Sequence, residues 1–312
     1  MASVLSAPHF HNEEAAYAYV ESRLWPEGPV CPRCGGVDRV GKMGGKSTRI
    51  GTYKCYQCRK PFTVKIGTIF EASHVPLNVW LQAMYLIAGS KKGISSNQLH
   101  RTLGVTLKTA WFMSHRIREA MRSDAPGFFG EGGGIVEADE TFIGIEPRVR
   151  SGEFGAGKRG SHHKMKVLAL VDRETGRSKA FVVDVVAADV IMPILRANLS
   201  REARLATDDH GVYRRAIKDF AAHGVVRHSR GQYGYGEIHT NTIEGYFSIF
   251  KRGMRGIYQW CGKNHLHRYL AEYDFRYSNR EANGINDKDR ADILLAGVVG
   301  RRLTYQRSCG RA

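Results

Sequence analysis

Two Cys-x-x-Cys pairs near the start of the chain constrain its fold more than any other feature. The pairs are CPRC at 31–34 and CYQC at 55–58, and 20 residues separate them. Two such turns can place four thiolates around one tetrahedral zinc ion, and this spacing is typical of a zinc ribbon. We therefore predict one structural zinc ion, held by Cys31, Cys34, Cys55 and Cys58.

The surroundings of the cysteine pairs favour a metal site over redox chemistry. The stretch RIGTYKCYQCRKPFTVKIGTIF (49–70) supplies the alternating strands that a ribbon needs. A redox motif is the alternative, but two matched pairs argue against it. A domain of about forty residues has little core, so the metal should contribute much of its folding free energy. Four cations beside the cysteines would contact DNA or form a solvated surface: Arg33, Lys54, Arg59 and Lys60.

The charge of the whole chain indicates a polyanionic partner. Its net charge is +17 and its isoelectric point about 9.7. Nucleic acid is the usual partner of so basic a protein, and an anionic membrane surface is the rival. The sequence contains no apolar run that could span a bilayer, and the N-terminus lacks the order of a signal peptide. We therefore expect a cytoplasmic protein that associates with double-stranded DNA and not with a membrane.

The glycine-rich stretch SDAPGFFGEGGG (123–134) indicates a domain boundary. The pattern before it is helical from residue 76, whereas strands and helices alternate after it. The basic, glycine-rich stretch 147–164 reads as a loop that would contact the DNA backbone. We predict an α+β and α/β multidomain chain with a helix and zinc ribbon at 13–70, a helix-turn-helix domain at 71–124, a ribonuclease H-like catalytic domain at 134–285 and a basic C-terminal tail at 286–312.

Residues 94–121 have the order of a helix-turn-helix. Ser96 can cap a first helix, Gly104 makes the turn, and Thr106 can cap a second helix. An earlier helix starts at Pro76, and three helices with a tight turn before the last one are typical of this DNA-binding motif. A plain helical connector is the alternative. In the DNA-binding interpretation, the second helix presents outward Lys108, Thr109, Phe112, His115 and Arg116.

From Ile135 onward the predicted order is β-β-β-α-β-α-β-α, the succession found in ribonuclease H-like folds. Three carboxylates fall where that fold gathers metal ligands. Asp139 is on the first strand, Asp208 is just past the fourth, and Glu244 is on the last helix, with 35 residues between it and Asp208. Two Mg²⁺ ions held by such carboxylates can activate a water or a 3′-hydroxyl and stabilise the leaving oxygen.

Each carboxylate also has an ordinary structural interpretation. Asp139 could be a polar edge residue with Glu137 on the same face and Glu140 on the other. Asp208, or Asp209, could cap the following helix, and Glu244 could pair with Lys251 or Ser248. Their joint occurrence, in order and on the right elements, favours the metal site.

Four motifs together resemble the insertion-sequence transposases of the ISXO-like group. They are CPRCGG…CYQC, VEADETFIG, TDDHGVY and HTNTIEGYFSIFKRGMRGIYQW…HLHRYLAEYDFRYSNR, and the resemblance runs from about residue 13 to residue 281. It implies a bacterial transposase, associated with the nucleoid, that has a zinc ribbon and an acidic-triad (DDE) domain. Such an enzyme cleaves DNA at the element ends and joins the 3′-hydroxyls to target DNA, as a homodimer or larger assembly.

The resemblance also assigns roles to single residues. Asp139 and Asp208 would be the first two acids and would hold two Mg²⁺ or Mn²⁺ ions. Related elements have Asn or Glu at the third position, and HTNTIE offers both Asn241 and Glu244. We favour Glu244, because a charged oxygen binds Mg²⁺ better than an amide does. His239 and Asn241 would be supporting residues, and DNA near the reacting phosphate would be contacted by Lys251 and its neighbour Arg252.

Two other functions fit part of this pattern. One is a non-catalytic DNA-binding protein on a degenerate nuclease fold, and the presence of all three acids argues against it. The other is a structure-specific DNA nuclease without strand transfer. The combination of ribbon and helix-turn-helix favours a protein that recognises particular end sequences.

Overall fold

The computed structural model describes residues 3–122, 127–144, 163–214, 216–227, 231 and 234–304. The chain forms two compact units, and one of them is discontinuous in sequence. The N-terminal unit combines residues 1–122 with 285–312, and the central unit is the continuous stretch 123–284.

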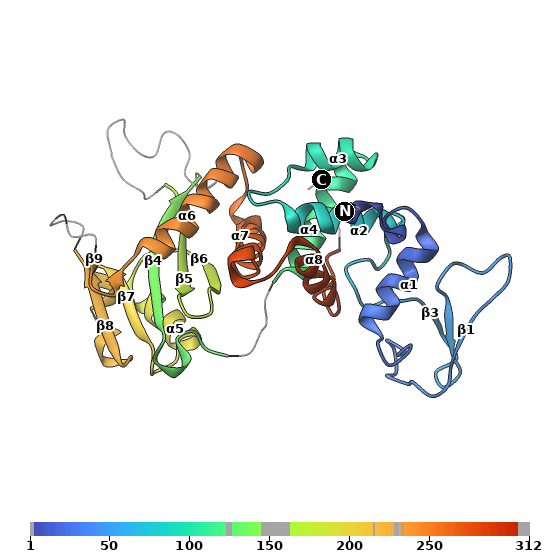
Figure 1. Ribbon diagram of the computed structural model, residues 1–312, viewed down its shortest axis with the longest axis horizontal. Helices are drawn as coiled ribbons and strands as arrows, with labels where there is room; N and C mark the ends of the chain where they lie inside the picture. The colour runs from blue at the N-terminus through green and yellow to red at the C-terminus, as the bar shows by residue number, and fades with distance from the viewer. Residues whose placement is uncertain are drawn as a thin grey trace, which may run out of the picture. The chain divides into compact units, whose positions relative to one another are not determined.

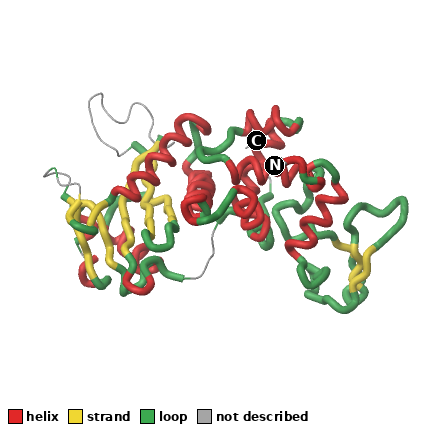
Figure 2. Tube along the Cα trace, in the orientation of Figure 1, coloured by secondary structure: helices red, strands yellow, loops and turns green. Residues whose placement is uncertain are grey.

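The first part of the N-terminal unit is the predicted ribbon. Helix α1, Glu13–Leu24, begins after Asn12, whose side chain accepts a hydrogen bond from the Ala15 amide at 2.9 Å. Three short strands then form one antiparallel sheet in the order β1-β2-β3 (Figure 2): Val40–Lys42, Tyr53–Cys55 and Pro61–Phe62. Cys31, Cys55 and Phe62 form its small buried core.

The predicted helices before the glycine-rich linker are present: α2 at Leu77–Gly89, α3 at Ser96–Leu103 and α4 at Leu107–Ala120. Gly104 has a φ of 67°, a left-handed conformation that glycine adopts without strain, and it ends α3. The Thr106 side chain accepts from the Thr109 amide at 3.2 Å and so caps α4 as expected. The cap of α3 is Ser95 rather than Ser96.

The prediction of a basic tail at 286–312 is wrong for its first part. Residues Asp287–Ala296 form helix α8, which packs against α2. Arg290, 8% exposed, donates to the carbonyl of Ala88 at 3.2 Å, and Leu294 and Leu295 are buried. Asn286 caps the helix by accepting from two amides in its first turn. An N-cap, an acidic first turn and apolar residues favour a helix over a tail in this segment.

The central unit is built on a mixed five-stranded sheet in the order β6-β5-β4-β7-β8 (Figure 1). β4 pairs antiparallel with β5, and β5 pairs antiparallel with β6, whereas β7 and β8 run parallel to β4. This succession resembles the predicted ribonuclease H-like order. The strands β4 to β8 are Ile135–Ile143, Met165–Asp172, Ser178–Val183, Arg204–Asp208 and Ala222–Val226.

Helices cover both faces of this sheet. One face, with Val136, Ala138 and Leu170, packs on α5 (Ala188–Asn198). The other face, with Val167 and Ala169, packs on α6 (Asn241–Gly253) and α7 (Lys263–Ser278). A short π-helical turn, Met254–Tyr258, follows α6. Because successive residues of a strand point to opposite faces, Glu137 and Asp139 of β4 lie on the α6 side.

The segment after β7 differs from the prediction of one helix. It contains two short 3-10 helices, Gly211–Tyr213 and Ala216–Lys218, and it buries Val212, Tyr213, Ala216 and Phe220 in the core on the α5 side of the sheet. The next strand is β8, which ends at Val226. A hairpin that the pattern did not predict, β9 (Gly234–Tyr235) and β10 (Ile238–His239), leads directly into α6.

Candidate active site and zinc site

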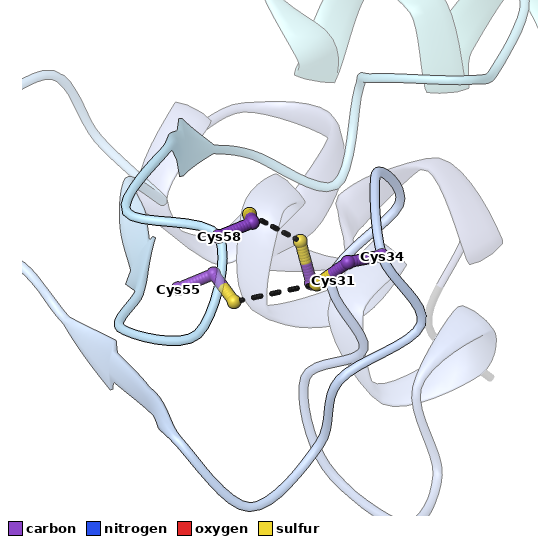
Figure 3. A group of neighbouring side chains, drawn as sticks. All are labelled: Cys31, Cys34, Cys55 and Cys58. Atoms are coloured by element: carbon purple, nitrogen blue, oxygen red, sulfur yellow. Dashed lines mark hydrogen bonds between the residues drawn. The ribbon is translucent and has the colours of Figure 1, made fainter.

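The four predicted cysteines converge in the N-terminal unit (Figure 3). The Sγ atoms of Cys31 and Cys58 are 3.7 Å apart, and those of Cys34 and Cys55 are 3.6 Å apart. Zn–S bonds of about 2.3 Å place the sulfurs of a regular tetrahedron roughly 3.8 Å apart. All four sulfurs lie within 4.8 Å of one another. The donor set and its spacing therefore fit one structural zinc ion.

A second cluster of metal-ligating groups lies in the central unit. Asp139, Glu140 and Asp208 each have a carboxylate oxygen within 4.8 Å of the other two. The parallel pairing of β4 with β7 matches Glu137 with Ala206. Extending this register by two residues places Asp139 opposite Asp208, where the two strands are no longer paired. The structure thus brings the first two predicted acids together.

Asp139 is the most strongly perturbed acid of this cluster. Burial raises the pKa of Asp139 to about 7, and the charges of Glu140, Asp208 and Glu244 act in the same direction. The Glu140 amide, which donates to Asp139 Oδ1 at 2.7 Å, opposes these effects. A carboxyl group among other carboxylates prefers to keep its proton unless a cation is present. The cluster is therefore suited to a cation that displaces this proton.

Glu140 is the site residue that sequence reasoning missed. The Tyr213 hydroxyl donates to its Oε2 at 2.7 Å, and His210 Nδ1 lies 3.9 Å from its Oε1. Burial raises the pKa of Glu140. Alternation along β4 places the side chain of Glu140 on the opposite face from Asp139, so the sequence pattern alone does not predict that it joins the metal site. The signal was the pair of adjacent acids on one strand, where the backbone N–H of Glu140 can bond the carboxylate of Asp139.

Glu244 lies near this cluster, but it is not one of the three residues whose carboxylate oxygens lie within 4.8 Å of one another. It is exposed on α6, accepts from the Thr240 hydroxyl at 3.1 Å, and its charge contributes to the raised pKa of Asp139. Asn241 is the first residue of α6 and is also exposed. Lys251, two turns after Glu244, is half-buried and close enough to Asp139 for their charges to interact. Burial lowers the pKa of Lys251.

The predicted DNA-contacting residues of α4 divide into two groups. Lys108 is exposed, and Thr109 and Phe112 are half-buried. These three residues help to line a hollow of about 260 Å³. The rest of its lining consists of Ala72, Ser73, His74, Val75, Trp80, Met113 and Arg116. In the central unit, Arg252 is exposed, and its Nε donates to the Ser248 carbonyl at 3.1 Å.

The prediction that His115 and Arg116 face outward is wrong. Their exposed fractions are 1% and 6%. Arg116 donates to the carbonyls of Ile69 at 2.8 Å, Glu71 at 2.9 Å and Leu303 at 3.1 Å. All residues from 113 to 120 are buried, so the second half of α4 has no outward face. Arg116 therefore holds three chain segments of the N-terminal unit together.

The predicted basic loop 147–164 lies almost entirely outside the described residues, as 145–162 are not among them. Among the residues that the structure does describe, no helix is both long and apolar enough to cross a membrane.

The sequence matches two families of protein domains. Residues 132–278 match the ISXO2-like transposase domain, and residues 11–61 match the transposase zinc-ribbon domain. The chain therefore combines an ISXO2-like transposase domain with a transposase zinc-ribbon domain. Its central unit carries the DDE transposase domain, so the enzyme catalyses DNA transposition.

One curated relative of this transposase is an uncharacterized protein in the transposable element ISH50 of Halobacterium salinarum. It is 29% identical over 281 residues, which are 86% of this chain and 91% of the relative. Because that organism is an archaeon, the relative gives no support to the bacterial host that the resemblance implied.

Two solved structures are similar to parts of the transposase. One is the simian T-cell lymphotropic virus intasome in complex with the PP2A regulatory subunit B56 gamma, with 15% identity and a TM-score of 0.27. That match covers 61% of this chain and 64% of the viral complex's chain. The other is a pre-cleavage Mos1 transpososome, with 12% identity, a TM-score of 0.22 and coverage of 63% and 75%.

Proposed function

We propose that Asp139, Asp208 and Glu244 hold two Mg²⁺ or Mn²⁺ ions with which the transposase cleaves element ends and joins them to target DNA. The convergence of Asp139 with Asp208 is the observation that carries the proposal. Glu244 is the third ligand because its charge reaches Asp139 from the helix that covers this face of the sheet. When bound, such ions activate the attacking hydroxyl or water and stabilise the leaving oxygen.

Glu140 is a further oxygen donor for the same ions. Its carboxylate is closer to Asp139 and Asp208 than the sequence pattern implied, and Tyr213 fixes its orientation. Hard cations bind through several carboxylate oxygens, so four acids around one site are compatible with two ions. Asn241 keeps only a supporting role, because an amide oxygen carries no charge.

Lys251 and Arg252 contribute cations for DNA on the same helix as Glu244. Lys251 lies near Asp139, so its ammonium group can bind a phosphate that also approaches the metal ions. Arg252 is exposed one residue later. Contacts of this kind position the backbone without reading sequence. His239 supports the start of α6.

The N-terminal unit recognises the element ends in this proposal. The three helices α2 to α4 act as a helix-turn-helix, with Lys108 and Thr109 at the accessible start of α4 as contact residues. The zinc ribbon adds further cationic contacts. Two ends must be brought together for transposition, so the active complex with double-stranded DNA contains two or more copies of the chain.

The test is an end-cleavage and strand-joining assay with Mg²⁺. The variants Asp139→Asn and Asp208→Asn should lose cleavage and joining while they still bind end DNA. Asp209→Asn is the matched control, since Asp209 is exposed, adjacent in sequence and outside the carboxylate cluster. Full activity in Asp139→Asn or Asp208→Asn would refute the metal site.

A parallel series separates the candidates for the third ligand. Glu244→Gln and Glu140→Gln should each weaken metal binding, whereas Asn241→Ala should not. If only Asn241→Ala abolished the chemistry, the assignment of Glu244 would be wrong.

A further inference from the structure

Glu137 is a buried carboxylate on β4 that the metal site does not use. Its side chain is 0% exposed, and it lies two residues before Asp139 on the same face of the strand. Its Oε1 accepts from Arg173 Nε at 2.6 Å, and its Oε2 accepts from the Ile243 amide at 2.8 Å. Both oxygens are therefore engaged within the protein.

The bond to Ile243 makes Glu137 a cap for α6 that comes from the sheet. Ile243 is the third residue of the helix, and the first N–H groups of a helix have no partner within it. The side chain of Thr240, at the N-cap position, makes no capping bond to a helix amide, and its hydroxyl donates to Glu244. A carboxylate at this end also interacts favourably with the helix dipole. The start of α6 is thereby tied to β4.

Arg173 holds the chain that leads into α6. It follows β5, and its guanidinium donates to the Glu237 carbonyl at 2.5 Å and to the His239 carbonyl at 2.8 Å. Arg173 Nη2 also lies 2.9 Å from His239 Nδ1. His239 Nδ1 also lies 3.2 Å from Glu137 Oε1, so the imidazole contacts both partners of the ion pair. One side chain therefore fixes the hairpin strand β10, the imidazole and Glu137 together.

We infer that Glu137 and Arg173 are a positioning pair that sets the place of Glu244 relative to Asp139. Asp139 follows Glu137 by two residues on β4, and Glu244 follows Ile243 by one residue on α6. The bond from Glu137 to Ile243 thus connects the two elements right beside the two acids. The inference rests on the proposed role of Glu244 as a metal ligand.

A positioning role for Glu137 and Arg173 can be distinguished from a purely stabilising role, because the two roles affect different quantities. A buried ion pair is weak evidence for stability, because desolvation offsets much of the attraction. Residues that orient metal ligands, in contrast, typically change metal affinity about 10–100-fold when they are replaced. Glu137→Gln keeps the shape of the side chain but turns an NH₂ group or a weaker oxygen toward the Ile243 amide. This variant tests the cap with minimal change in volume.

The experiment measures Mn²⁺ affinity of the full-length, zinc-loaded chain by calorimetry and by electron paramagnetic resonance. Glu137→Gln and Arg173→Lys should each weaken Mn²⁺ binding by about tenfold. Glu244→Ala should weaken it as well, and adding Glu137→Gln to Glu244→Ala should have little further effect, because both act through the same ligand. The control Arg204→Gln removes an exposed 2.9 Å ion pair to Glu237, on the same hairpin, and should leave the affinity unchanged.

Thermal unfolding of every variant is recorded in the same experiment. If Glu137→Gln and Arg173→Lys lower only the melting temperature while Mn²⁺ affinity stays at the wild-type value, the pair is structural and the inference fails. It also fails if the effects of Glu137→Gln and Glu244→Ala simply add. If Glu244→Ala itself leaves Mn²⁺ affinity unchanged, the proposed ligand set fails first, and the positioning role falls with it. Should Glu137→Gln not fold, Arg173→Lys and its combination with Glu244→Ala decide the question.

Discussion

Asp139 and Asp208 face each other from two parallel strands, each with a carboxylate oxygen within 4.8 Å of the other's. Without a cation these charges repel, and the charge of Asp208 contributes to the raised pKa of Asp139. We expect Asp208→Asn to leave the metal-free chain as stable as the wild type or more stable. Binding of Mn²⁺ at about 100 times its dissociation constant should stabilise the wild type by about 2.7 kcal/mol and should not stabilise the variant.

Differential scanning fluorimetry with and without Mn²⁺ measures both effects. A gain of that size corresponds to a rise in melting temperature of roughly 5–10 °C for a unit of this size. Asp209→Asn should respond to Mn²⁺ like the wild type. An undiminished rise in Asp208→Asn would show that the ion binds elsewhere.

Removal of zinc should unfold the ribbon and leave the central unit folded. The ribbon core consists of two of the cysteines and Phe62, so little remains to hold it without the metal. Cys55→Ser should lose the zinc and become sensitive to proteolysis between residues 31 and 62. Elemental analysis should find one zinc per wild-type chain. Cys261→Ala removes a cysteine that is buried in the core of the central unit, and its zinc content should stay unchanged.

Replacing Lys108 and replacing Arg116 of α4 should have different effects, the first on DNA binding and the second on folding stability. Lys108→Ala should weaken binding to end DNA and lower the slope of log affinity against log salt by about one, with an unchanged fold. Arg116→Met should destabilise the N-terminal unit by about 3 kcal/mol, because one buried carbonyl and two half-buried carbonyls lose their donor. Urea unfolding and fluorescence anisotropy separate the two outcomes. A stable Arg116→Met chain that has lost only DNA binding would contradict the structural role.

Asp274 should make the stability of the central unit depend on pH. It accepts from the Tyr246 hydroxyl at 2.8 Å and the Ala180 amide at 2.9 Å, yet burial raises the pKa of Asp274 to about 6. The folded state then holds this proton more tightly than the unfolded chain, whose Asp titrates near pH 3.9. The contribution of Asp274 to stability is therefore full below about pH 4 and is lost as pH rises to about 6.

The measurement compares urea unfolding of the wild type and of Asp274→Asn between pH 4 and pH 7. A shift of about two pH units corresponds to roughly 3 kcal/mol, so the difference between the two proteins should change by about that amount over this interval. It should be constant above pH 7. A difference that does not vary with pH would mean that Asp274 is ionised throughout.

Local signals in the sequence predicted the zinc site and most of the secondary structure. The spacing of the four cysteines depends only on two tight turns. Asp139 and Asp208 were predictable because each belongs to a strand of recognisable pattern, Asp139 in the middle of β4 and Asp208 at the end of β7. These features require knowledge of only a few neighbouring residues.

The errors arose where tertiary packing decides the outcome. His115 and Arg116 were assigned to an outward face on the assumption that α4 buries a single stripe, but its second half is buried on all sides. Glu140 belongs to the face of β4 opposite Asp139, and only the end of the pairing with β7 brings it to Asp208. No periodicity in the sequence reports where two strands separate.

The discontinuity of the N-terminal unit affects the order in which the protein can be completed. α2 packs against α8, which is synthesised only after the whole central unit. Domains generally fold as units during synthesis, from the N-terminus onward. In this chain the catalytic sheet and α6 are therefore available for folding while the surface of α2 that receives α8 is still uncovered. The N-terminal unit is begun first in synthesis and completed last. A nascent chain therefore contains the whole central unit, with its carboxylate cluster, before it contains the whole N-terminal unit.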